Sequence, residues 1–272
     1  MPRAAGGRGR QPPVLKKFGQ HFLTDPAILS AIVDALAPTK SDTVVEIGPG
    51  RGSLTDILAQ RAGRLVAIEI DRALAAQLRE RYASSATVEI VEGDFLETDA
   101  RTLGVDDYLL IGNVPYYITT PIVFKALETP MPRRSVFLVQ REVAQRMAAA
   151  AGDEDYGALS VNIAVVANVE NVLHVPAGAF RPPPKVESAV VRLTPRAEPM
   201  VSAASLAAFR TFVQAAFGQR RKQMVRVLRS VRGLSPQRAS EVLLAVGIEP
   251  NVRPEVVTPL EFARLFAAVS ED

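Results

Sequence analysis

The chain has 272 residues, 48% of them hydrophobic and 22% charged, with a formal net charge of +3. This composition is typical of a folded protein with one large domain, or with one large and one small domain. Cysteine is absent, and His21 and His174 are the only histidines, which excludes disulfides and cysteine zinc sites and argues against a multi-histidine metal centre. No apolar run reaches membrane-spanning length, and the polar N-terminus lacks the apolar core of a secretory signal. We therefore expect a cytoplasmic protein with no metal and no contact with a membrane.

The N-terminus is rich in Gly, Pro and Arg, and residues 1–13 predict a disordered tail. Residues 1–17 carry five basic side chains and no acid. Such a segment is either a solvated tail or a flexible arm that binds phosphates.

Short apolar strands alternate with helices from residue 25 to about residue 150. Asp25-Pro26 predicts the N-cap and first position of a helix that Pro38 ends. After it, we expect strands at 43–48, 64–70, 87–94, 107–113 and 135–140, and helices at about 53–62, 72–82, 120–128 and 142–150. This alternation predicts a parallel sheet covered by helices. Residues 159–170 and 186–194 are further strand candidates, whose spacing suits a sheet that closes with a late hairpin.

Beyond about residue 200 the pattern predicts helices only. Ser235-Pro236 begins one helix, and Thr258-Pro259-Leu260-Glu261 is a capping box that begins another. We therefore expect a large α/β domain over 14–199 and a small all-α domain over 200–272.

Three acids follow successive predicted strands around a glycine-rich turn. Glu46 precedes the turn that contains Gly48 and Gly50, Glu69 lies at the end of the second strand, and Asp94 ends the third. Glycines at a strand-to-helix turn let a ligand approach the backbone, and ligands of open α/β sheets bind at the carboxyl ends of the strands. The glycine pattern alone is weak, and a lone acid at a strand end is common on protein surfaces.

One ligand accounts for all three acids together. The acid at Glu69 can accept hydrogen bonds from ribose hydroxyls, and Asp94 with Phe95 beside it suits the amino group and ring of adenine. S-adenosylmethionine contains ribose and adenine, and its sulfonium and ammonium charges match an acidic lining. We therefore predict S-adenosylmethionine as the cofactor.

The motif Asn113-Val114-Pro115-Tyr116 ends the fourth predicted strand. An asparagine carbonyl and a backbone carbonyl can hold an NH₂ group by its two hydrogens, which orients the nitrogen lone pair. Pro115 stiffens the turn, and Tyr116 offers a face on which a base can stack. Because a sulfonium carries its own leaving group, catalysis by positioning and electrostatics suffices without a strong general base. An ordinary Asn-x-Pro turn is the alternative interpretation.

The motif and its flanks resemble a known family, the bacterial small-subunit ribosomal RNA adenine dimethyltransferases. The resemblance covers about residues 14–270, in order. It rests on the segments KKFGQHFLTD (16–25), VVEIGPGRGSLT (44–55), AIEIDRALA (67–75), GNVPYYITTPI (112–122), VQREVAQRM (139–147), YGALSV (156–161), AFRPPPKVESAVVRL (179–193), FGQRRKQMVRVL (217–228) and GIEPNVRPE (247–255). It implies a class I, Rossmann-like methyltransferase fold with a mostly parallel seven-stranded sheet and a small helical domain.

The resemblance also implies roles for individual residues. His21 and Leu23 would line the cofactor pocket, and Gly48, Gly50, Glu69, Asp94 and Asn113 would complete it. Asn113, Pro115 and Tyr116 would hold the adenine, and Phe180 would stack on its other face. His21 departs from the family, most of whose members have asparagine there, and Val114 stands where most have leucine.

The stretch 218–232 contains six basic residues and no acid. On one continuous helix, Lys222, Arg226 and Arg229 would share a face opposite an apolar one. We expect this face, with Arg220 and Arg221, to contact RNA phosphates, although a solvated face is the usual role of such a stripe.

The substrate implied by the resemblance is a hairpin near the 3′ end of 16S rRNA in an immature small subunit, with two adjacent adenines dimethylated at N6. A base modified at N6 must leave any stack, which favours unpaired adenines. The alternatives are a large-subunit rRNA methyltransferase of the macrolide-resistance type, a DNA adenine methyltransferase, and an assembly factor without catalysis. We expect a monomer, because no apolar stripe remains after the core is assigned.

Overall fold

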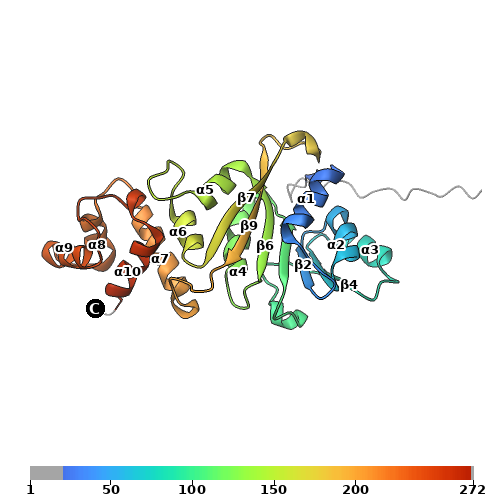
Figure 1. The fold of residues 1–272 in the computed structure, drawn as a ribbon, viewed down its shortest axis with the longest axis horizontal. Coiled ribbons are helices and arrows are strands. Elements are labelled where there is room, and N and C mark those ends of the chain that lie inside the picture. Colours follow the sequence, from blue (N-terminus) through green and yellow to red (C-terminus); the bar gives the residue numbers. More distant parts are fainter. Residues whose placement is uncertain (1–20, 271–272) are drawn as a thin grey trace, which may run out of the picture.

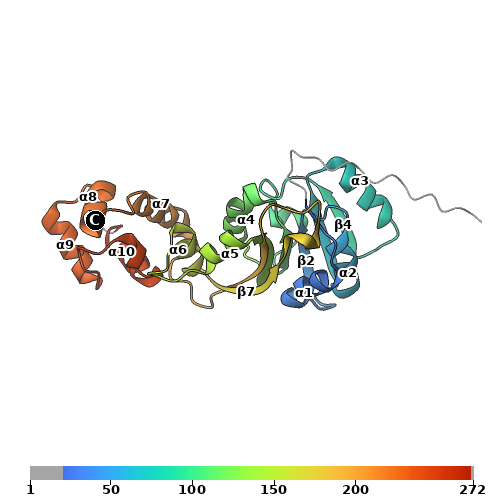
Figure 2. The ribbon, with the colours of Figure 1, turned by 90° about the horizontal axis from the view of Figure 1, so that it is seen from above.

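The computed structural model describes residues 21–270. The molecule is elongated, with the sheet and its covering helices towards one end and helices α8, α9 and α10 at the other (Figures 1 and 2). The predicted basic tail at 1–13 lies outside the described residues.

The central sheet has seven strands in the order β4-β3-β2-β5-β6-β9-β7. The first five strands in this order, β4, β3, β2, β5 and β6, are mutually parallel, whereas β9 runs antiparallel to both β6 and β7. The strands span Thr43–Ile47 (β2), Arg64–Glu69 (β3), Val88–Glu92 (β4), Leu109–Asn113 (β5), Arg134–Gln140 (β6), Ala167–Val175 (β7) and Ser188–Pro195 (β9). The predicted α/β fold with a mostly parallel seven-stranded sheet and a late hairpin is confirmed.

Helices cover both faces of this sheet (Figure 1). Successive strand residues point to opposite faces, so Val44 and Val45 belong to different hydrophobic cores. One core contains residues of α1 and α2, and the other contains residues of α4, α5 and α6. These helices, with α3, span Pro26–Leu36 (α1), Ser53–Arg61 (α2), Arg72–Arg81 (α3), Thr119–Ala126 (α4), Arg141–Ala148 (α5) and Ala158–Ala164 (α6).

The N-cap signals in the sequence act as predicted. The Asp25 side chain accepts hydrogen bonds from the backbone N–H groups of Ala27 and Ile28, and Thr258 and Glu261 form a complete capping box. These side chains satisfy N–H groups that have no partner inside the helix.

The C-terminal part consists of α7 (Leu206–Phe217), α8 (Met224–Arg232), α9 (Pro236–Ala245) and α10 (Pro259–Ala268). Short 3₁₀ helices occur at Ala100–Leu103, Tyr116–Ile118, Ala177–Ala179, Ala203–Ser205 and Pro254–Val256. Apolar side chains of α7, α8, α9 and α10 join the same core as α6 and one face of the sheet. The division into domains at 14–199 and 200–272 stays a prediction.

Two predicted elements are wrong in part. Residues 159–170 are not one strand, because Ala158–Ala164 forms α6 and β7 begins at Ala167. The residues Leu159 to Ile163 are all buried, including the polar Ser160 and Asn162. A short segment buried on every side fits a helix as well as a strand. Residues 218–232 are not one helix either, because α7 ends at Phe217, turns follow, and α8 begins at Met224.

Two short strands join distant parts of the chain. Phe22–Leu23 (β1) pairs antiparallel with Phe180–Arg181 (β8). The backbone N–H of Thr24 also donates to the carbonyl of Ala179. This pairing holds the N-terminal segment against the loop that precedes β9.

Candidate active site

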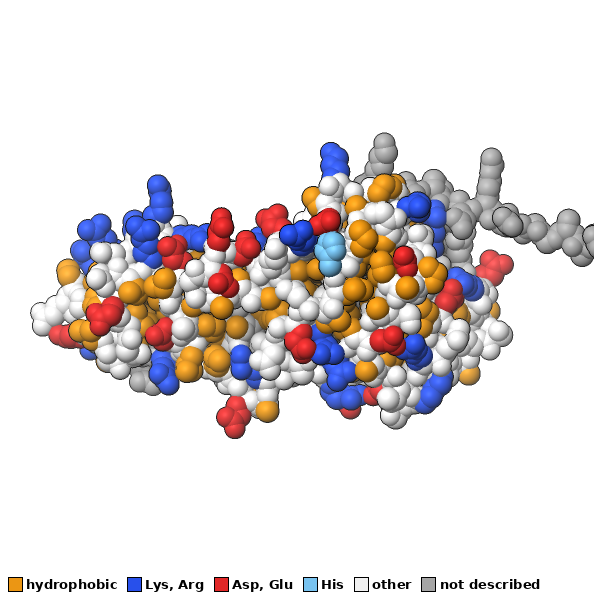
Figure 3. Space-filling view, turned by 45° about the horizontal axis from the view of Figure 1, so that its top comes forward, with side chains coloured by type: hydrophobic (Ala, Val, Ile, Leu, Met, Phe, Trp, Pro, Cys, Tyr) orange, Lys and Arg blue, Asp and Glu red, His pale blue; other side chains and the backbone are white. Residues whose placement is uncertain are grey.

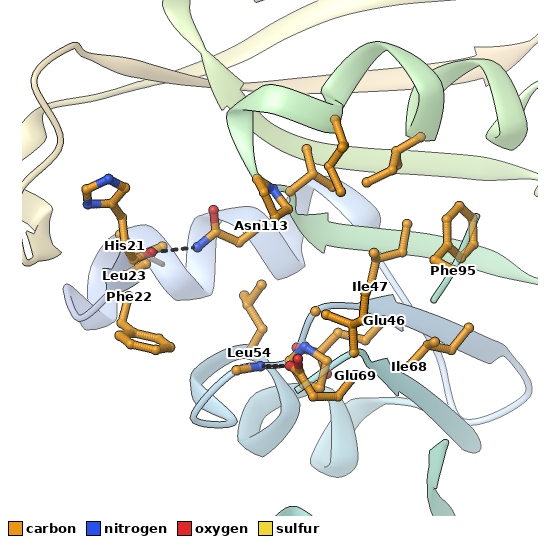
Figure 4. Close-up of a pocket in the computed structure, with 18 of the residues that line it drawn as sticks. His21, Phe22, Leu23, Glu46, Ile47, Leu54, Ile68, Glu69, Phe95 and Asn113 are labelled. Atoms are coloured by element: carbon orange, nitrogen blue, oxygen red, sulfur yellow. Dashed lines mark hydrogen bonds between the residues drawn. The ribbon is translucent and has the colours of Figure 1, made fainter. Parts of the chain in front are cut away.

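The main candidate site is a cavity at the carboxyl ends of β2, β3 and β5 (Figure 4). The chain winds outward from β2 through β3 to β4 and then returns to β5 on the other side of β2. Ligands of such sheets bind where the winding reverses. The open space is about 1140 Å³ including the solvent at its mouth, which is enough for a cofactor and part of a substrate.

The cavity brings together nearly all the side chains predicted from the sequence for cofactor and acceptor. Its lining includes His21, Leu23, Gly48, Gly50, Glu69, Asp94, Asn113, Pro115 and Tyr116. These residues come from the segment of β1, the turn after β2, and the ends of β3, β4 and β5. The structure thus places them at one edge of the sheet, and their roles stay a prediction.

The glycine turn is fixed by Glu69. Gly48 and Gly50 both have positive φ angles, of 62° and 59°, a conformation that favours glycine. The Gly50 N–H donates to one Glu69 carboxylate oxygen at 2.9 Å, and the Asp71 N–H donates to the other at 2.8 Å. Burial raises the pKa of Glu69 in spite of these hydrogen bonds. Glu69 therefore orients the turn and still presents acceptor lone pairs to the cavity.

Glu46 is a buried acid in the lining of the same cavity. Its side chain is 1% exposed, and its Oε2 atom has no hydrogen-bond partner among the described residues. Burial, with the nearby charge of Glu69, raises the pKa of Glu46 to about 8. A buried carboxylate oxygen without a partner is costly, so burial favours the protonated form of Glu46.

The wall after β4 consists of Asp94, Phe95 and Leu96. One Asp94 carboxylate oxygen accepts from the Leu96 N–H at 2.8 Å. Lys125 of α4 donates to the Leu96 carbonyl at 2.6 Å, and its Nζ lies 5.6 Å from the centre of the Phe95 ring. Lys125 thus ties the helix after the Asn-x-Pro motif to this wall.

Asn113 faces the N-terminal segment across the cavity (Figure 4). Its Nδ2 donates to the His21 carbonyl at 3.1 Å. Because the amide N–H₂ is held there, the Oδ1 acceptor is directed away from His21. The β1–β8 pair therefore determines which end of the Asn113 amide is available to an acceptor amine.

Tyr116 stands beside this amide. Its hydroxyl shares a hydrogen bond with Ser188 Oγ at 2.7 Å, and burial raises its pKa, so it stays neutral. The His21 ring is nearly parallel to the Tyr116 ring, with centroids 6.1 Å apart, and the His21 Nδ1 lies 2.8 Å from the Pro182 carbonyl. Both rings are thus oriented by hydrogen bonds at their edges.

Phe180 is not brought into the cavity. Its side chain is 1% exposed and packs in the core with α1 and α2. Its backbone pairs with Leu23 of β1, so the segment borders the site although the ring does not line it. The predicted stacking of Phe180 on a base stays a prediction and requires its ring to turn out of this core.

Some contacts of the site had no signal in the sequence. The Arg51 guanidinium lies 4.4 Å from the centre of the Phe22 ring, and both residues line the cavity. Ser188 holds Tyr116 from β9. Neither a periodicity nor a local motif distinguishes these residues, because their roles depend on chain segments far apart in sequence.

The predicted RNA-contacting cations lie at the helical end, where Lys and Arg side chains gather on the upper edge in Figure 3. Arg226 and Arg229 are exposed on α8, whereas Met224, Val227 and Leu228 are buried beneath them. Lys222 and Arg221 lie in the preceding turn and not on the helix. Arg220 is paired with Glu255, at 3.0 Å, and donates to the Glu154 carbonyl. The charge of Arg220 is thus balanced by an acid that is distant in sequence, and the local run of basic residues could not indicate this pairing.

Residues 21–270 contain neither a metal-binding cluster nor a membrane-spanning helix. No group of three His, Asp or Glu side chains is arranged to hold a metal ion. No helix in this part of the chain is both long and apolar enough to cross a bilayer.

Comparison with known proteins identifies the family. The family model described as ribosomal RNA adenine dimethylase matches residues 14–271. A ribosomal RNA small subunit methyltransferase A from Aromatoleum aromaticum is 43% identical over 251 residues, which are 92% of this chain and 92% of the relative.

Two solved structures are similar to this chain over 92% of its length. A dimethyladenosine transferase from Plasmodium falciparum has a TM-score of 0.79 and 25% identity, covering 92% of this chain and 98% of its own. The 23S rRNA methyltransferase ErmE has a TM-score of 0.71 and 30% identity, and the match covers 92% of this chain and 99% of the ErmE chain. The match spans the sheet, the cavity and the C-terminal helices, and the chain belongs to the ribosomal RNA adenine dimethylase family.

Proposed function

We propose that this enzyme transfers methyl groups from S-adenosylmethionine to the N6 amines of two adjacent adenines in a hairpin near the 3′ end of 16S rRNA. The substrate particle is an immature small ribosomal subunit. The name of the Aromatoleum relative supports the small-subunit substrate over the large-subunit alternative. The observation that carries the proposal is the Asn113 amide, whose N–H₂ is held by His21 and whose Oδ1 is left to accept from an incoming amine.

The lining of the cavity fits S-adenosylmethionine. The sulfonium and ammonium charges of the cofactor suit Glu46, whose Oε2 has no partner among the described residues. Glu69 and Asp94 offer carboxylate oxygens to ribose and adenine, and the glycine turn lets the ligand approach the backbone. His21, Leu23, Gly48, Gly50 and Asn113 complete the proposed cofactor site. When bound, the cofactor supplies an activated methyl group with a neutral leaving group.

The protein's own contribution is positioning. In the first transfer, Asn113 Oδ1 and the backbone carbonyl of the Asn-x-Pro turn accept the two N6 hydrogens, which turns the nitrogen lone pair towards the methyl group. In the second transfer one hydrogen remains on N6, and one of these two oxygens accepts it. Tyr116 supplies a stacking face, held in place by Ser188. A strong base is not required, because the nitrogen becomes positively charged and acidic once its bond to the methyl group has formed, and it then releases a proton to water. The neutral Tyr116 hydroxyl serves as an anchor, not as a proton acceptor.

The exposed cations of the helical end provide the RNA contact in this proposal. Arg221, Lys222, Arg226 and Arg229 have no acidic partner among the described residues, so they remain available to phosphates. Residues 14–199 would then carry catalysis and residues 200–272 RNA binding. We further propose a cytoplasmic monomer that needs no metal.

Methyl transfer by the wild type and by Asn113→Ala tests the proposal. The wild type should methylate immature small subunits, and the variant should lose at least about 100-fold in kcat, the cost of removing one preorganised polar contact in a catalytic site. Thermal unfolding of both proteins provides the control for folding. If Asn113→Ala keeps the methyl-transfer rate of the wild type, Asn113 has no catalytic role.

A further inference from the structure

Tyr117 is an exposed aromatic ring at the rim of the candidate active site. Its side chain is 64% exposed and lines the cavity. Every other Phe or Tyr within residues 21–270 is buried or partly buried. An exposed large apolar group is informative when it borders a binding site, so the position of this ring calls for an explanation.

The local backbone directs Tyr117 outward. Tyr116, Tyr117 and Ile118 form a single 3₁₀ turn, in which successive side chains lie about 120° apart. Tyr116 is turned inward, where its hydroxyl meets Ser188. The hydroxyl of Tyr117 has no hydrogen-bond partner in the described part of the chain, and its ring has no aromatic or cationic neighbour there. Within residues 21–270, no hydrogen bond or ring contact therefore holds this side chain.

The proposed reaction creates a need for such a ring. When an adenine leaves its stack to enter the cavity, the nucleotide beside it loses a stacking partner. In a pair of adjacent adenines, that nucleotide must remain near the mouth of the cavity, because one sugar-phosphate link joins it to the base inside. An exposed aromatic ring at the mouth offers the neighbouring base a new face.

We propose that Tyr117 is a stacking platform for the nucleotide next to the adenine held by Asn113 and Tyr116. This inference rests on the proposed function, since it assumes a flipped adenine in RNA. Tyr116 and Tyr117 would then bind two successive bases, one inside the cavity and one at its rim. The ring offsets part of the cost of unstacking and keeps the second adenine beside the site.

Replacement of the ring measures this role. Stacking of a base on an aromatic side chain contributes on the order of 1–3 kcal/mol, so Tyr117→Ala should raise KM for immature small subunits about 5- to 150-fold. Cofactor affinity should stay unchanged, and Tyr117→Phe should stay within about twofold of the wild type. Val172→Ala, which truncates a 39% exposed side chain on β7, is the matched control.

A direct readout follows from the composition. The chain contains no tryptophan, so Tyr117→Trp gives a single fluorescent reporter at the rim, and Val172→Trp gives one on β7, outside the lining of the cavity. A hairpin RNA with two adjacent unpaired adenines in its loop should quench the first reporter and not the second. A fully paired RNA of the same length should quench neither.

The outcomes separate the two proposals. If the wild type methylates small subunits but Tyr117→Ala has an unchanged KM, or the hairpin quenches both tryptophans equally, the stacking role is wrong. The same holds if Tyr117→Ala weakens binding to the particle but not to the isolated hairpin, because the ring would then contact a protein. If the wild type methylates no RNA, the proposed function itself fails.

Discussion

Replacement of Glu46 by glutamine tests the electrostatics of the cofactor cavity. Each pH unit by which a pKa rises corresponds to about 1.4 kcal/mol. A rise from 4.5 to about 8 therefore penalises the ionised form by on the order of 5 kcal/mol. Glutamine keeps the shape of the neutral carboxyl but never ionises, so Glu46→Gln removes this penalty.

The sign of the effect follows from proton release by the unfolded chain. Below about pH 4.5 Glu46 is neutral in both states. Between about pH 4.5 and 8 the unfolded chain loses this proton whereas the folded protein keeps it, so the wild type loses stability relative to Glu46→Gln by about 1.4 kcal/mol per pH unit. Above about pH 8 both states are ionised, and the difference should become constant.

Urea unfolding of both proteins between pH 4 and 9 measures this difference. Glu187→Gln is a control of opposite sign, because Arg141 lowers the pKa of the exposed Glu187 carboxyl and its contribution is lost as the pH falls. Parallel pH profiles for the wild type and Glu46→Gln would refute the raised pKa. Cofactor binding should also release a proton from Glu46 near pH 7, which calorimetry in buffers of different ionisation enthalpy detects.

Three further perturbations have expected results. Lys125→Met removes the hydrogen bond to Leu96 and should weaken cofactor binding several-fold in a titration, whereas Lys125→Arg should retain most of the affinity. Arg226→Gln combined with Arg229→Gln should lower the slope of log affinity against log salt by about 1.5 for single-stranded RNA. Tyr156→Phe removes the buried hydrogen bond from its hydroxyl to the Val257 carbonyl and should lower the free energy of unfolding by about 1 kcal/mol in a denaturant titration.

Each of these results has a contrary outcome. Unchanged cofactor affinity in Lys125→Met would mean that the Phe95 wall does not depend on α4. Arg72→Gln, at an exposed site on α3, is the control for the α8 variant. If it lowers the salt slope as much per charge as the α8 variant does, RNA binding depends on the overall charge of the protein and not on α8. Wild-type stability in Tyr156→Phe would mean that another donor satisfies the carbonyl.

The parallel centre of the sheet could be predicted because β2, β3, β5 and β6 are short and mostly apolar and a helix follows each of them. Asp25, Thr258 and the glycine turn after β2 mark element boundaries through local chemistry, and the structure keeps them. Local pattern could not distinguish helix from strand at 158–164, where all faces are buried. The break at 218–223 does have a local signal, because Gly218 follows α7 directly and no apolar side chain occurs before Met224; the continuous run of basic residues concealed it.

The site was predictable to the extent that it lies at strand ends. Glu69, Asp94 and Asn113 follow neighbouring parallel strands, so topology alone brings them together. The pairing of β1 with β8 joins segments about 157 residues apart, and no local pattern specifies it. The burial of Phe180 and the ion pair of Arg220 with Glu255 depend on such distant contacts.

The most direct measurement is methyl transfer from labelled S-adenosylmethionine to immature small subunits, large subunits and duplex DNA in parallel, followed by nucleoside analysis. The proposed function predicts N6,N6-dimethyladenosine in small-subunit RNA alone. Label in large-subunit RNA or in DNA, or the absence of label while the cofactor still binds, would contradict it.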